Sequence, residues 1–336
     1  MKAAVLYETG GPEVLKIEEM PMPRPGPTQV LVKVAAAGMC GHDHADRTGI
    51  TRTERPVILG HEVSGVVVEV GEKVSHFQPG DSVASKQFAS CGRCVYCRSM
   101  RDLQCSERRF ARGGFAEYVA LDDQIIIKIP EGVDLEGASI AACAVGSCLR
   151  ALRQSAKVVH GETVVITGAG GGLGVHGLQV AKALGAHTIA VTSSPHKVEA
   201  LRKYGADQVV LAQGADYWRD IVEANNGEEP QVVIDTVGHP DVFTACFRAL
   251  GRHGRYVFIG QVYRQKVELY PAIVLGKEVV ITGSAATRMN EFLDAMEMVR
   301  LGTVRPVFQS FPLAQVVEAS RQMDDRKVFG RTVLVP

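Results

Sequence analysis

The sequence predicts an α/β protein with two domains, one rich in short strands and one built on a doubly wound parallel sheet. Its 336 residues exceed the usual size of a single domain. Residues 1 to about 148 form short apolar runs broken by Gly and Pro, whereas strands and helices alternate from about residue 160. The 35 glycines suit the many tight turns of such a chain. We place the domain boundaries at 1–148, 149–286 and 287–336.

The first domain is predicted from apolar runs that alternate with polar residues. We expect strands at 2–7, 29–36, 63–70 and 81–84, with PMPRPGP and QPGD as loops. The segment after about residue 286 holds an expected helix at 290–301, another after Pro312, and a last strand, RTVLV. This tail resembles a return to the first domain, so we expect that domain to be discontinuous.

The second domain is predicted from six apolar strands with helical patterns between most of them. The strands are expected at 163–167, 187–192, 208–211, 231–235, 254–259 and 278–283, and helices at 195–204 and 241–250. Crossover helices between such strands are typical of a parallel doubly wound sheet.

Charge and hydropathy limit the partners. Lys plus Arg and Asp plus Glu both number 37, so neither nucleic acid nor an anionic membrane is an expected partner. No apolar run approaches the roughly 18 residues of a membrane span. The N-terminus lacks the apolar core of a secretion signal, so we expect a cytoplasmic protein.

Four cysteines in the run CGRCVYCRSMRDLQC predict a structural zinc site. The spacing of Cys91, Cys94, Cys97 and Cys105 places four thiolates around one point, as tetrahedral zinc requires. Disulfides are the competing interpretation, but a reducing compartment favours metal. Because a four-thiolate site is closed, metal chemistry would need a second, more open site.

The run GAGGGLG follows the strand at 163–167 and precedes an amphipathic helix, which predicts a dinucleotide-binding loop. Its glycines allow a tight turn and bring the backbone close to a pyrophosphate at the helix N-terminus. A tight turn without a ligand is the alternative. The candidate cofactor-binding residues of the loop are Gly168, Gly171, Gly172, Leu173 and Gly174.

The next strand ends in VTSSPHK, which favours NADP(H) over NAD(H). An acidic residue about 20 positions beyond the loop would bind a ribose 2′-hydroxyl. Here Ser193, Ser194, His196 and Lys197 occupy that segment instead and can donate to a 2′-phosphate. The small residues also tolerate NAD.

Outside the four-cysteine run, Cys40, the pair His61–Glu62, and Cys143 are candidate ligands of an open zinc site. Two thiolates and one imidazole leave a zinc position for water or substrate. Taken singly, each cysteine is more often a buried inert thiol.

The order of several motifs changes this interpretation. The chain is similar to the zinc-containing medium-chain dehydrogenase/reductase superfamily through GxCGxD at 38–43, GHEVSGVV at 60–67, the four-cysteine segment, GGFAEY at 113–118, CAVGSCLRAL at 143–152, TGAGGGLG at 167–174 and VFGRTVLV at 328–335. This resemblance implies a GroES-like β-barrel catalytic domain, completed by the tail, and a Rossmann domain.

The resemblance also implies residue roles. Cys40, His61 and Cys143 match the catalytic zinc ligands, giving two zincs per chain, and Glu62 matches the carboxylate that exchanges with water on the metal. Asp43 matches the partner that orients the ligand histidine. Arg331 matches an arginine that meets the cofactor's phosphates.

Two positions depart from the usual proton relay of these alcohol dehydrogenases. His42 stands where Ser or Thr is common, and Ala45 replaces a relay histidine. His42 is suited to acid–base work, or it forms a pocket wall. We interpret His44 as a surface or structural residue and Cys148 and Cys246 as core residues. Gln87, Phe88 and Phe110 are candidate pocket residues that specify no substrate.

The cofactor domain also resembles the acryloyl-CoA reductase branch through VTSS, VIDTVGHP and GSAATR. We therefore expect an NADP(H)-linked alcohol dehydrogenase, with an enoyl-CoA reductase as the alternative. A non-catalytic zinc scaffold would not explain an open site beside a dinucleotide loop. The exposed edge expected at strand 278–283 predicts a homodimer or homotetramer.

Overall fold

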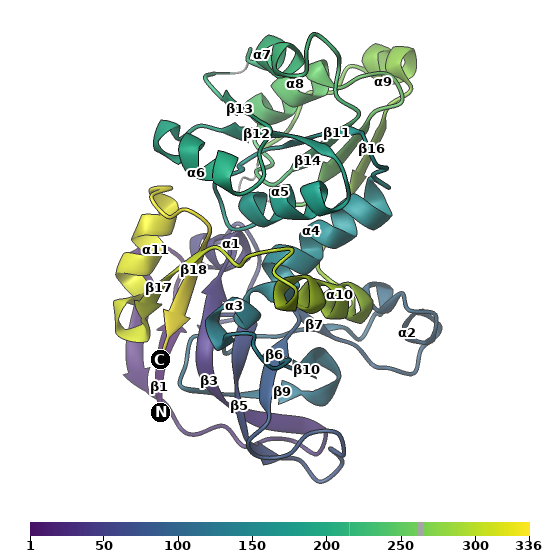
Figure 1. Ribbon diagram of the computed structural model, residues 1–336. Helices are drawn as coiled ribbons and strands as arrows, with labels where there is room; N and C mark the ends of the chain where they lie inside the picture. Colours follow the sequence, from purple (N-terminus) through teal and green to yellow (C-terminus); the bar gives the residue numbers. More distant parts are fainter. Residues whose placement is uncertain (215, 261–264) are drawn as a thin grey trace. The chain divides into compact units, whose positions relative to one another are not determined.

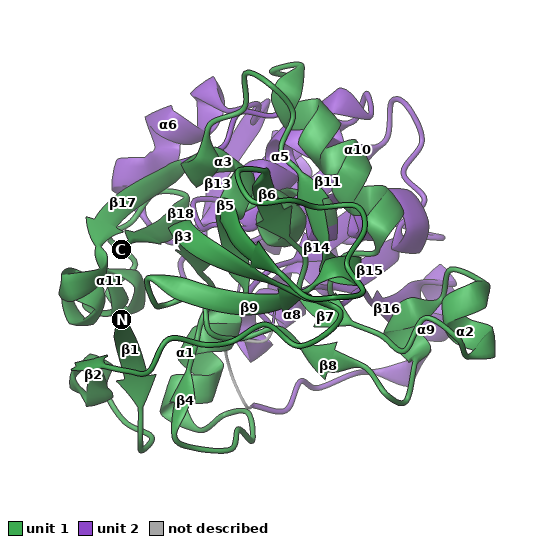
Figure 2. Cartoon of the chain, turned by 90° about the horizontal axis from the view of Figure 1, so that it is seen from below, with its two compact units in different colours: residues 1–146, 286–302, 308–336 green, residues 147–285, 303–307 purple. Residues whose placement is uncertain are grey.

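The computed structural model describes residues 1–214, 216–260 and 265–336. The chain divides into two compact units, which Figure 2 shows in different colours. Unit 1 comprises residues 1–146, 286–302 and 308–336, and unit 2 comprises residues 147–285 and 303–307. Residues 286–302 and 308–336 belong to the same unit as the N-terminus, and the first segment of that unit ends at Gly146.

Unit 1 is built mainly on antiparallel strands, with β17 (Phe308–Pro312) and β18 (Arg331–Val335) paired in parallel, and they bury one large apolar cluster and several smaller ones. Among the described residues, its largest sheet has the order β10 (Ile126–Lys128), β6 (Ser82–Ser85), β5 (Glu62–Val70), β3 (Gln29–Met39), β18 and β17, with β9 (Tyr118–Asp122) paired to β3. Smaller sheets contain β1 (Lys2–Leu6), β2 (Leu15–Glu19) and β4 (Val57–Ile58), and β7 (Phe88–Ala89) with β8 (Arg109–Phe110). Alternate residues of β3, such as Val30, Val32 and Val34, lie in the core.

Strand β3 is longer than the sequence predicts. It continues past residue 36 to Met39, because Gly38 pairs with Glu62 on one side and with Val333 on the other. Ala36 and Ala37 are fully buried, so this end of the strand shows no alternation of apolar and polar residues. The extension places Cys40 directly after the central strand.

The helical segments of unit 1 are short. They are α1 (Gly41–Thr48), α2 (Val95–Arg98), α3 (Leu135–Ser139), the π-helical segment η4 (Ala141–Gly146), α10 (Met289–Arg300) and α11 (Val316–Asp324), with 3₁₀ turns η1 (Pro12–Val14), η2 (Asp102–Gln104), η3 (Asp123–Ile125) and η7 (Leu313–Gln315). Helix α10 packs on η4 through Phe292 and Met296, which share a buried cluster with Ala141 and Ala142.

Unit 2 is the doubly wound domain that the sequence predicts. Within the described residues, its parallel sheet has the order β13 (Gln208–Leu211), β12 (His187–Thr192), β11 (Thr163–Ile166), β14 (Val232–Asp235), β15 (Arg255–Phe258) and β16 (Val280–Gly283). The strand order reverses at β11, which is where such sheets bind their ligands. Figure 1 shows the sheet among its helices.

The helices of unit 2 are α4 (Ser147–Arg150), a second π-helical segment η5 (Ala151–Ser155), α5 (Gly174–Ala183), η6 (Pro195–Lys197), α6 (Val198–Lys203), α7 (Trp218–Ala224), α8 (Pro240–Ala249) and α9 (Pro271–Lys277). Cys148 and Cys246 are fully buried, as predicted for core residues.

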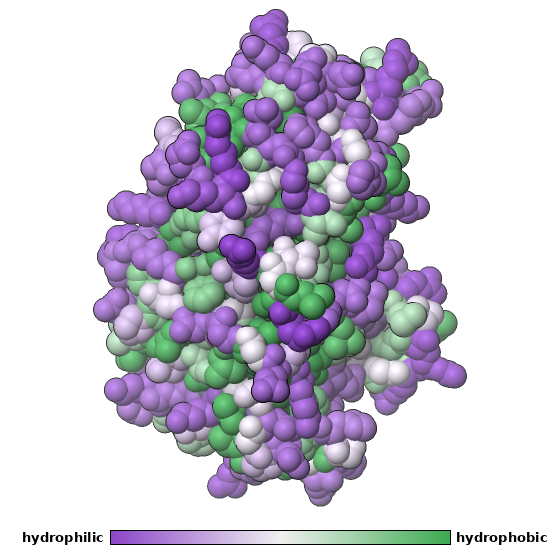
Figure 3. Space-filling model, in the orientation of Figure 1, coloured by the Kyte–Doolittle hydropathy of each residue, from purple (hydrophilic) through white to green (hydrophobic). Residues whose placement is uncertain are grey.

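Hydrophilic side chains cover much of the face drawn in Figure 3, with hydrophobic ones interspersed. Among the described residues, every helix is too short or too polar to reach across a membrane.

Candidate metal centres and cofactor loop

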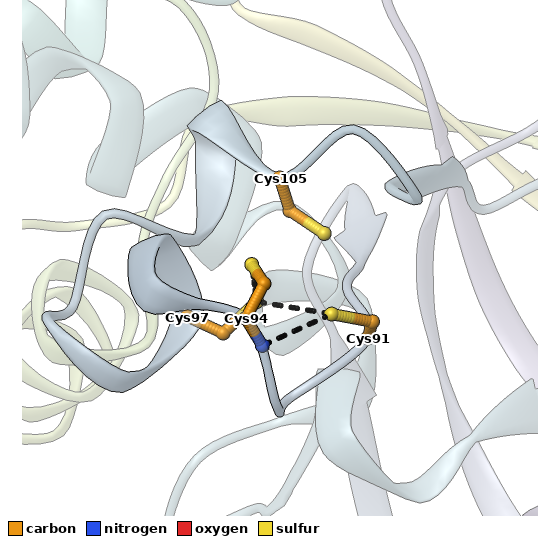
Figure 4. Close-up of side chains that lie close together, drawn as sticks. All are labelled: Cys91, Cys94, Cys97 and Cys105. Carbon is orange, nitrogen blue, oxygen red and sulfur yellow. Dashed lines mark hydrogen bonds between the residues drawn. The ribbon is translucent and has the colours of Figure 1, made fainter.

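The four cysteines at 91–105 converge on one point, as Figure 4 shows. Their sulfur atoms all lie within 4.8 Å of one another. The Sγ–Sγ distance is 3.5 Å from Cys94 to Cys97 and 3.9 Å from Cys91 to Cys97. Two thiolates on a tetrahedral zinc, each bonded at about 2.3 Å, stand about 3.8 Å apart. The donor set and its spacing therefore fit a closed zinc site.

Local backbone turns are sufficient to bring these cysteines together. Cys94 precedes α2, Cys97 lies in it, and Cys105 directly follows η2. The backbone N–H groups of Arg93 and Cys94 lower the pKa of Cys91 to about 6, which favours the thiolate that a metal binds. We call residues 91–105 the cysteine lobe.

A second cluster, in unit 1, joins Cys40, His61, Glu62 and Cys143, whose ligand atoms also lie within 4.8 Å of one another. His61 Nε2 is 3.2 Å from the Cys40 sulfur, 3.9 Å from the Cys143 sulfur and 3.9 Å from Glu62 Oε1. The predicted open-site residues are therefore adjacent in space despite their distance in sequence. We call them the buried cluster, since three of the four are buried.

Helix α1 positions the first of these ligands. Cys40 is the N-cap residue, and its sulfur accepts a hydrogen bond from the backbone N–H of His42 at 3.2 Å. The positive end of the helix dipole favours a thiolate at this position. Asp43 accepts the backbone N–H groups of Cys40 at 2.9 Å and Gly60 at 3.1 Å, so one carboxylate fixes the backbone of the ligand Cys40 and of the residue before the ligand His61.

Asp43 also faces the other nitrogen of His61, with its Oδ1 3.4 Å from Nδ1. Although burial disfavours the imidazolium, the charge and hydrogen bond of Asp43 raise the pKa of His61 well above its usual value. A carboxylate behind a ligand histidine fixes the ring and directs Nε2 toward a metal.

The charge balance of the buried cluster also fits a cation. Neither carboxylate oxygen of Glu62 has a hydrogen-bond partner among the described residues, and burial raises the pKa of Glu62 well above its usual value. Hydrogen bonding to Cys40, together with burial, raises the pKa of Cys143 to about 12. A divalent cation would stabilise the anionic forms of Glu62 and Cys143.

Arg331, at the start of β18, lies beside this cluster. It is 5% exposed, and its Nε is 3.3 Å from Glu62 Oε2. The structure thus brings Arg331 to the carboxylate. Its predicted contact with cofactor phosphates stays a prediction.

His42 stands at the accessible side of the cluster. Its side chain is 42% exposed, and its Nε2 is 3.8 Å from the buried Asp46. The ring of Phe110 lies 4.7 Å from the rings of both His42 and His61, and Phe88 is 4.9 Å from Phe110. Phe110 and Phe88 therefore form an aromatic wall next to the candidate ligands, whereas Gln87 is only 3% exposed.

The glycine-rich loop follows β11 and leads into α5, whose first residue is Gly174. Gly168 has a left-handed φ of 55°, and a Cβ there would lie 2.6 Å from Thr236 Oγ1. A Cβ on Gly174 would lie 2.4 Å from the Gly168 oxygen. The backbone therefore requires glycine at both positions. Gly171, Gly172 and Leu173 lie between them.

The residues predicted to contact a 2′-phosphate differ in how deeply they are buried. Ser193 is exposed and Ser194 is half-buried directly after β12, where the backbone N–H of Ser194 donates to Thr192 Oγ1 at 3.1 Å. Lys197 is buried, and its ammonium is 3.4 Å from the carbonyl oxygen of Gly170. A cation therefore lies beside the loop, held by the loop's own backbone.

The π-helical backbone that carries Cys143 was not predicted from the sequence. The run AACAVG has the same composition as an α-helical core segment, so its residues give no signal of a wider turn. Asp46 was not predicted as part of the site either. Its carboxylate accepts hydrogen bonds from Thr51, Thr53 and Arg112 and lies beside His42.

Known proteins resemble this chain over its whole length. Residues 26–131 match the family described as alcohol dehydrogenase GroES-like domain, and residues 172–300 match the family described as zinc-binding dehydrogenase. An acryloyl-coenzyme A reductase of Sulfurisphaera tokodaii is 34% identical, and an NAD-dependent alcohol dehydrogenase of the same organism is 33% identical; each comparison covers 100% of both chains. The crystal structure of a protein named AibC superposes with a TM-score of 0.91 at 38% identity, covering 100% of this chain and 96% of that one.

Proposed function

Because this chain belongs to the zinc-dependent medium-chain dehydrogenase/reductase superfamily and is an oxidoreductase, we propose that it catalyses the reversible NADP(H)-linked oxidation of a small alcohol to an aldehyde or ketone. The observation that supports this reaction most strongly is the cluster of Cys40, His61, Glu62 and Cys143 in a buried part of unit 1. Two thiols and an imidazole form a three-ligand set that zinc accepts, and the fourth position is then left for the exchangeable Glu62 carboxylate, water or substrate.

When bound, zinc supplies Lewis-acid polarisation of an alcohol or carbonyl oxygen. Cys40, His61 and Cys143 would hold it, with Glu62 as the exchangeable carboxylate. Asp43 fixes the His61 ring, and Arg331 balances the charge of Glu62. In the oxidation direction the substrate carbon gives a hydride to nicotinamide C4, and the hydroxyl proton leaves.

We assign that proton to His42. Its half-exposed ring lies between the aromatic wall and Asp46, so Nε2 can accept the proton and pass it to solvent. General acid–base assistance of this kind is worth about 10²-fold or more in rate. His42→Ala should therefore reduce kcat for alcohol oxidation about 10²-fold at unchanged zinc content. An unchanged kcat would make His42 a pocket wall only.

The reaction itself is tested by metal analysis together with a kinetic screen of primary and secondary alcohols, aldehydes, ketones and enoyl thioesters. We expect two zincs per fully loaded chain, and turnover of an alcohol or ketone that disappears when the buried-cluster zinc is removed. One zinc per loaded chain would contradict the proposal.

A specific observation favours a second candidate, an NADPH-dependent acryloyl-CoA (enoyl-CoA) reductase. The 34% identical relative carries that name. Reduction of an activated double bond requires a hydride at one carbon and a proton at its neighbour, with charge growing on the thioester oxygen. If zinc-free protein reduces acryloyl-CoA at full rate and loaded protein ignores alcohols and ketones, this second reaction replaces the first.

We further propose that the chain prefers NADP(H) to NAD(H). The support is the segment after β12, where Ser193 and Ser194 replace an acidic residue and Lys197 places its ammonium beside the loop. Hydrogen bonds to a charged phosphate are worth about 1.5–3 kcal/mol, so Lys197→Met should raise the KM for NADP(H) about tenfold or more and barely change that for NAD(H). Equal efficiency of the wild type with both cofactors would refute this preference.

We also propose a homodimer or homotetramer that uses the free edge of β16. This strand ends the described sheet of unit 2, and Val280 on it is 54% exposed. Leu275 on the preceding helix α9 is 80% exposed. Strand edges without protecting charges tend to pair across a two-fold axis. A monomer mass by light scattering at micromolar concentration would exclude this assembly.

A further inference from the structure

The third candidate ligand stands on unusual backbone. Cys143 lies in the π-helical segment η4, Ala141–Gly146. The other two ligands lie next to regular elements: Cys40 stands between β3 and α1, and His61 directly precedes β5. A π-helical hydrogen bond spans one more residue than an α-helical one, so returning η4 to α-helix would rotate the side chains that follow by about 100°. The direction of the Cys143 sulfur toward His61 therefore depends on this wide turn being maintained.

Thr287 makes the most direct contact with that turn. Its side chain is fully buried, and its hydroxyl donates to the carbonyl oxygen of Ala142 at 2.5 Å. Ala142 is the residue immediately before Cys143. Neighbouring backbone keeps α-helical bonding, since the Ala144 N–H donates to Ile140 at 2.9 Å. The hydroxyl thus binds η4 at the point where the ligand side chain leaves it.

The space for Thr287 is provided by the last residue of the same segment. A Cβ on Gly146 would lie 2.6 Å from the Thr287 methyl carbon Cγ2 and 3.1 Å from its hydroxyl oxygen. Any larger residue at 146 would displace Thr287. Ala286, directly before Thr287, has a left-handed φ of 60°, a conformation that non-glycine residues disfavour. The chain therefore accepts local backbone strain where it delivers Thr287 to η4.

From these contacts we infer that Thr287 is a positioning residue for the buried-cluster metal, acting through the backbone of η4 to direct Cys143, and that Gly146 is small in order to admit it. This inference rests on the proposed function, because it takes Cys143 as a metal ligand. Both residues belong to unit 1, as do all four members of the cluster.

The test measures metal affinity at each site, not only activity. Thr287→Val keeps the shape and removes the hydroxyl, whereas Thr287→Ser keeps the hydroxyl. Chelator competition should show a 10- to 100-fold weaker buried-cluster zinc in Thr287→Val, the usual effect of losing support behind a ligand. The zinc of the cysteine lobe should be unchanged, and Thr287→Ser should match the wild type. In cobalt-substituted protein, the visible bands of the buried cluster should shift in Thr287→Val only.

A matched control is Thr163→Val in unit 2, which also removes a buried threonine hydroxyl, bonded to Asn225 Oδ1 at 2.9 Å. Equal zinc loss in both valine variants would mean general destabilisation and would overturn the inference. Wild-type affinity and an unchanged cobalt spectrum in Thr287→Val would overturn it as well. A wild type that binds no zinc at the buried cluster would refute the proposed function first.

A second pair of variants decides the case if Thr287→Val does not fold. Gly146→Ala should weaken the buried-cluster zinc by displacing Thr287. The double variant Gly146→Ala/Thr287→Ser removes the clashing methyl and keeps the hydroxyl, so it should restore the affinity. A Gly146→Ala protein that binds zinc like the wild type, or a double variant that stays weak, contradicts the inference.

Discussion

The cysteine lobe and the buried cluster hold similar ligand atoms but are assembled in opposite ways. In the lobe, four cysteines come from 15 consecutive residues, 91–105, and short turns bring them together. In the buried cluster, the ligands come from the start of α1, the start of β5 and η4. Of the four cysteines of the lobe only Cys105 is buried, whereas the cluster adjoins the buried Asp43 and Arg331.

This difference separates two uses of a metal. Only Leu103 and Cys105 of the lobe are buried, so we expect its order to depend on a bound metal. The buried cluster stands on a packed sheet and on backbone hydrogen bonds that Asp43 accepts, so its geometry is set by the fold. Substitutions in the first should therefore change stability, and substitutions in the second should change chemistry.

The largest expected effect is on the lobe. Cys105→Ser should remove one zinc per chain and unfold the lobe locally, because structural zinc sites supply about 10–16 kcal/mol of binding free energy. Trypsin should then cleave rapidly after the exposed Arg98 and Arg101. Cys246→Ser, a buried cysteine of unit 2, is the control and should keep both zincs. A Cys105→Ser protein that resists trypsin like the wild type would contradict the structural role of the lobe zinc.

At the buried cluster, Cys40→Ser should act on turnover instead. We expect one zinc fewer per chain and at least a thousandfold lower kcat/KM with alcohols, about 4 kcal/mol of barrier. Thermal unfolding and trypsin resistance should stay close to the wild type. A loss of stability as large as in Cys105→Ser would show that both metals have a structural role.

An intermediate effect is expected from the carboxylate behind His61. Asp43→Asn should weaken the buried-cluster zinc about 10- to 100-fold in chelator competition, since support of this kind orients the ligand. Asp102→Asn is the matched control at the lobe, where Asp102 pairs with Lys86 at 3.1 Å. It should leave the buried-cluster affinity unchanged. Equal weakening by both variants would point to a general electrostatic effect.

The smallest expected effect concerns the ion pairs that join α11 to α1. Asp324 on α11 accepts from the buried Arg47 at 2.5 Å and contacts His44 Nδ1 at 2.7 Å. Although burial opposes ionisation, the hydrogen bond to His44 and the charge of Arg47 lower the pKa of Asp324. The carboxylate thus stabilises the fold above its unfolded pKa, and this stabilisation disappears as pH falls through the lower folded value.

Asp324→Asn should therefore lower the free energy of unfolding by about 1.5 kcal/mol at pH 7. The difference from the wild type should shrink below about pH 4, where unfolded aspartate protonates. Asp325→Asn removes only an exposed pair with Lys327 and should have almost no effect. Denaturant unfolding at several pH values measures both, and a pH-independent difference would contradict the role of the charge.

The same contrast explains what the sequence could predict. The cysteine lobe follows from spacing alone, because its ligands are neighbours in the chain. The parallel sheet of unit 2 follows from its apolar strands and the loop at Gly168. Cys40, His61 and Cys143 were grouped only through the family resemblance, since nothing local links residues so far apart. The buried end of β3, the π-helical turn at Cys143 and the contact of Thr287 depend on tertiary packing, which leaves no periodic pattern.

The pairing of β18 with β3 has a consequence for the order of events during synthesis. Thr332 pairs with Met39, the residue before Cys40, and Arg331 stands beside Glu62. Met39 and Thr332 are separated by almost 300 residues, so the ribosome synthesises Thr332 long after Met39. Unit 2 and the cysteine lobe can form on the growing chain, whereas the sheet behind Cys40 must wait for β18. On the proposed function, the lobe can thus bind a metal early, and the buried cluster can bind one only after the last strand has emerged.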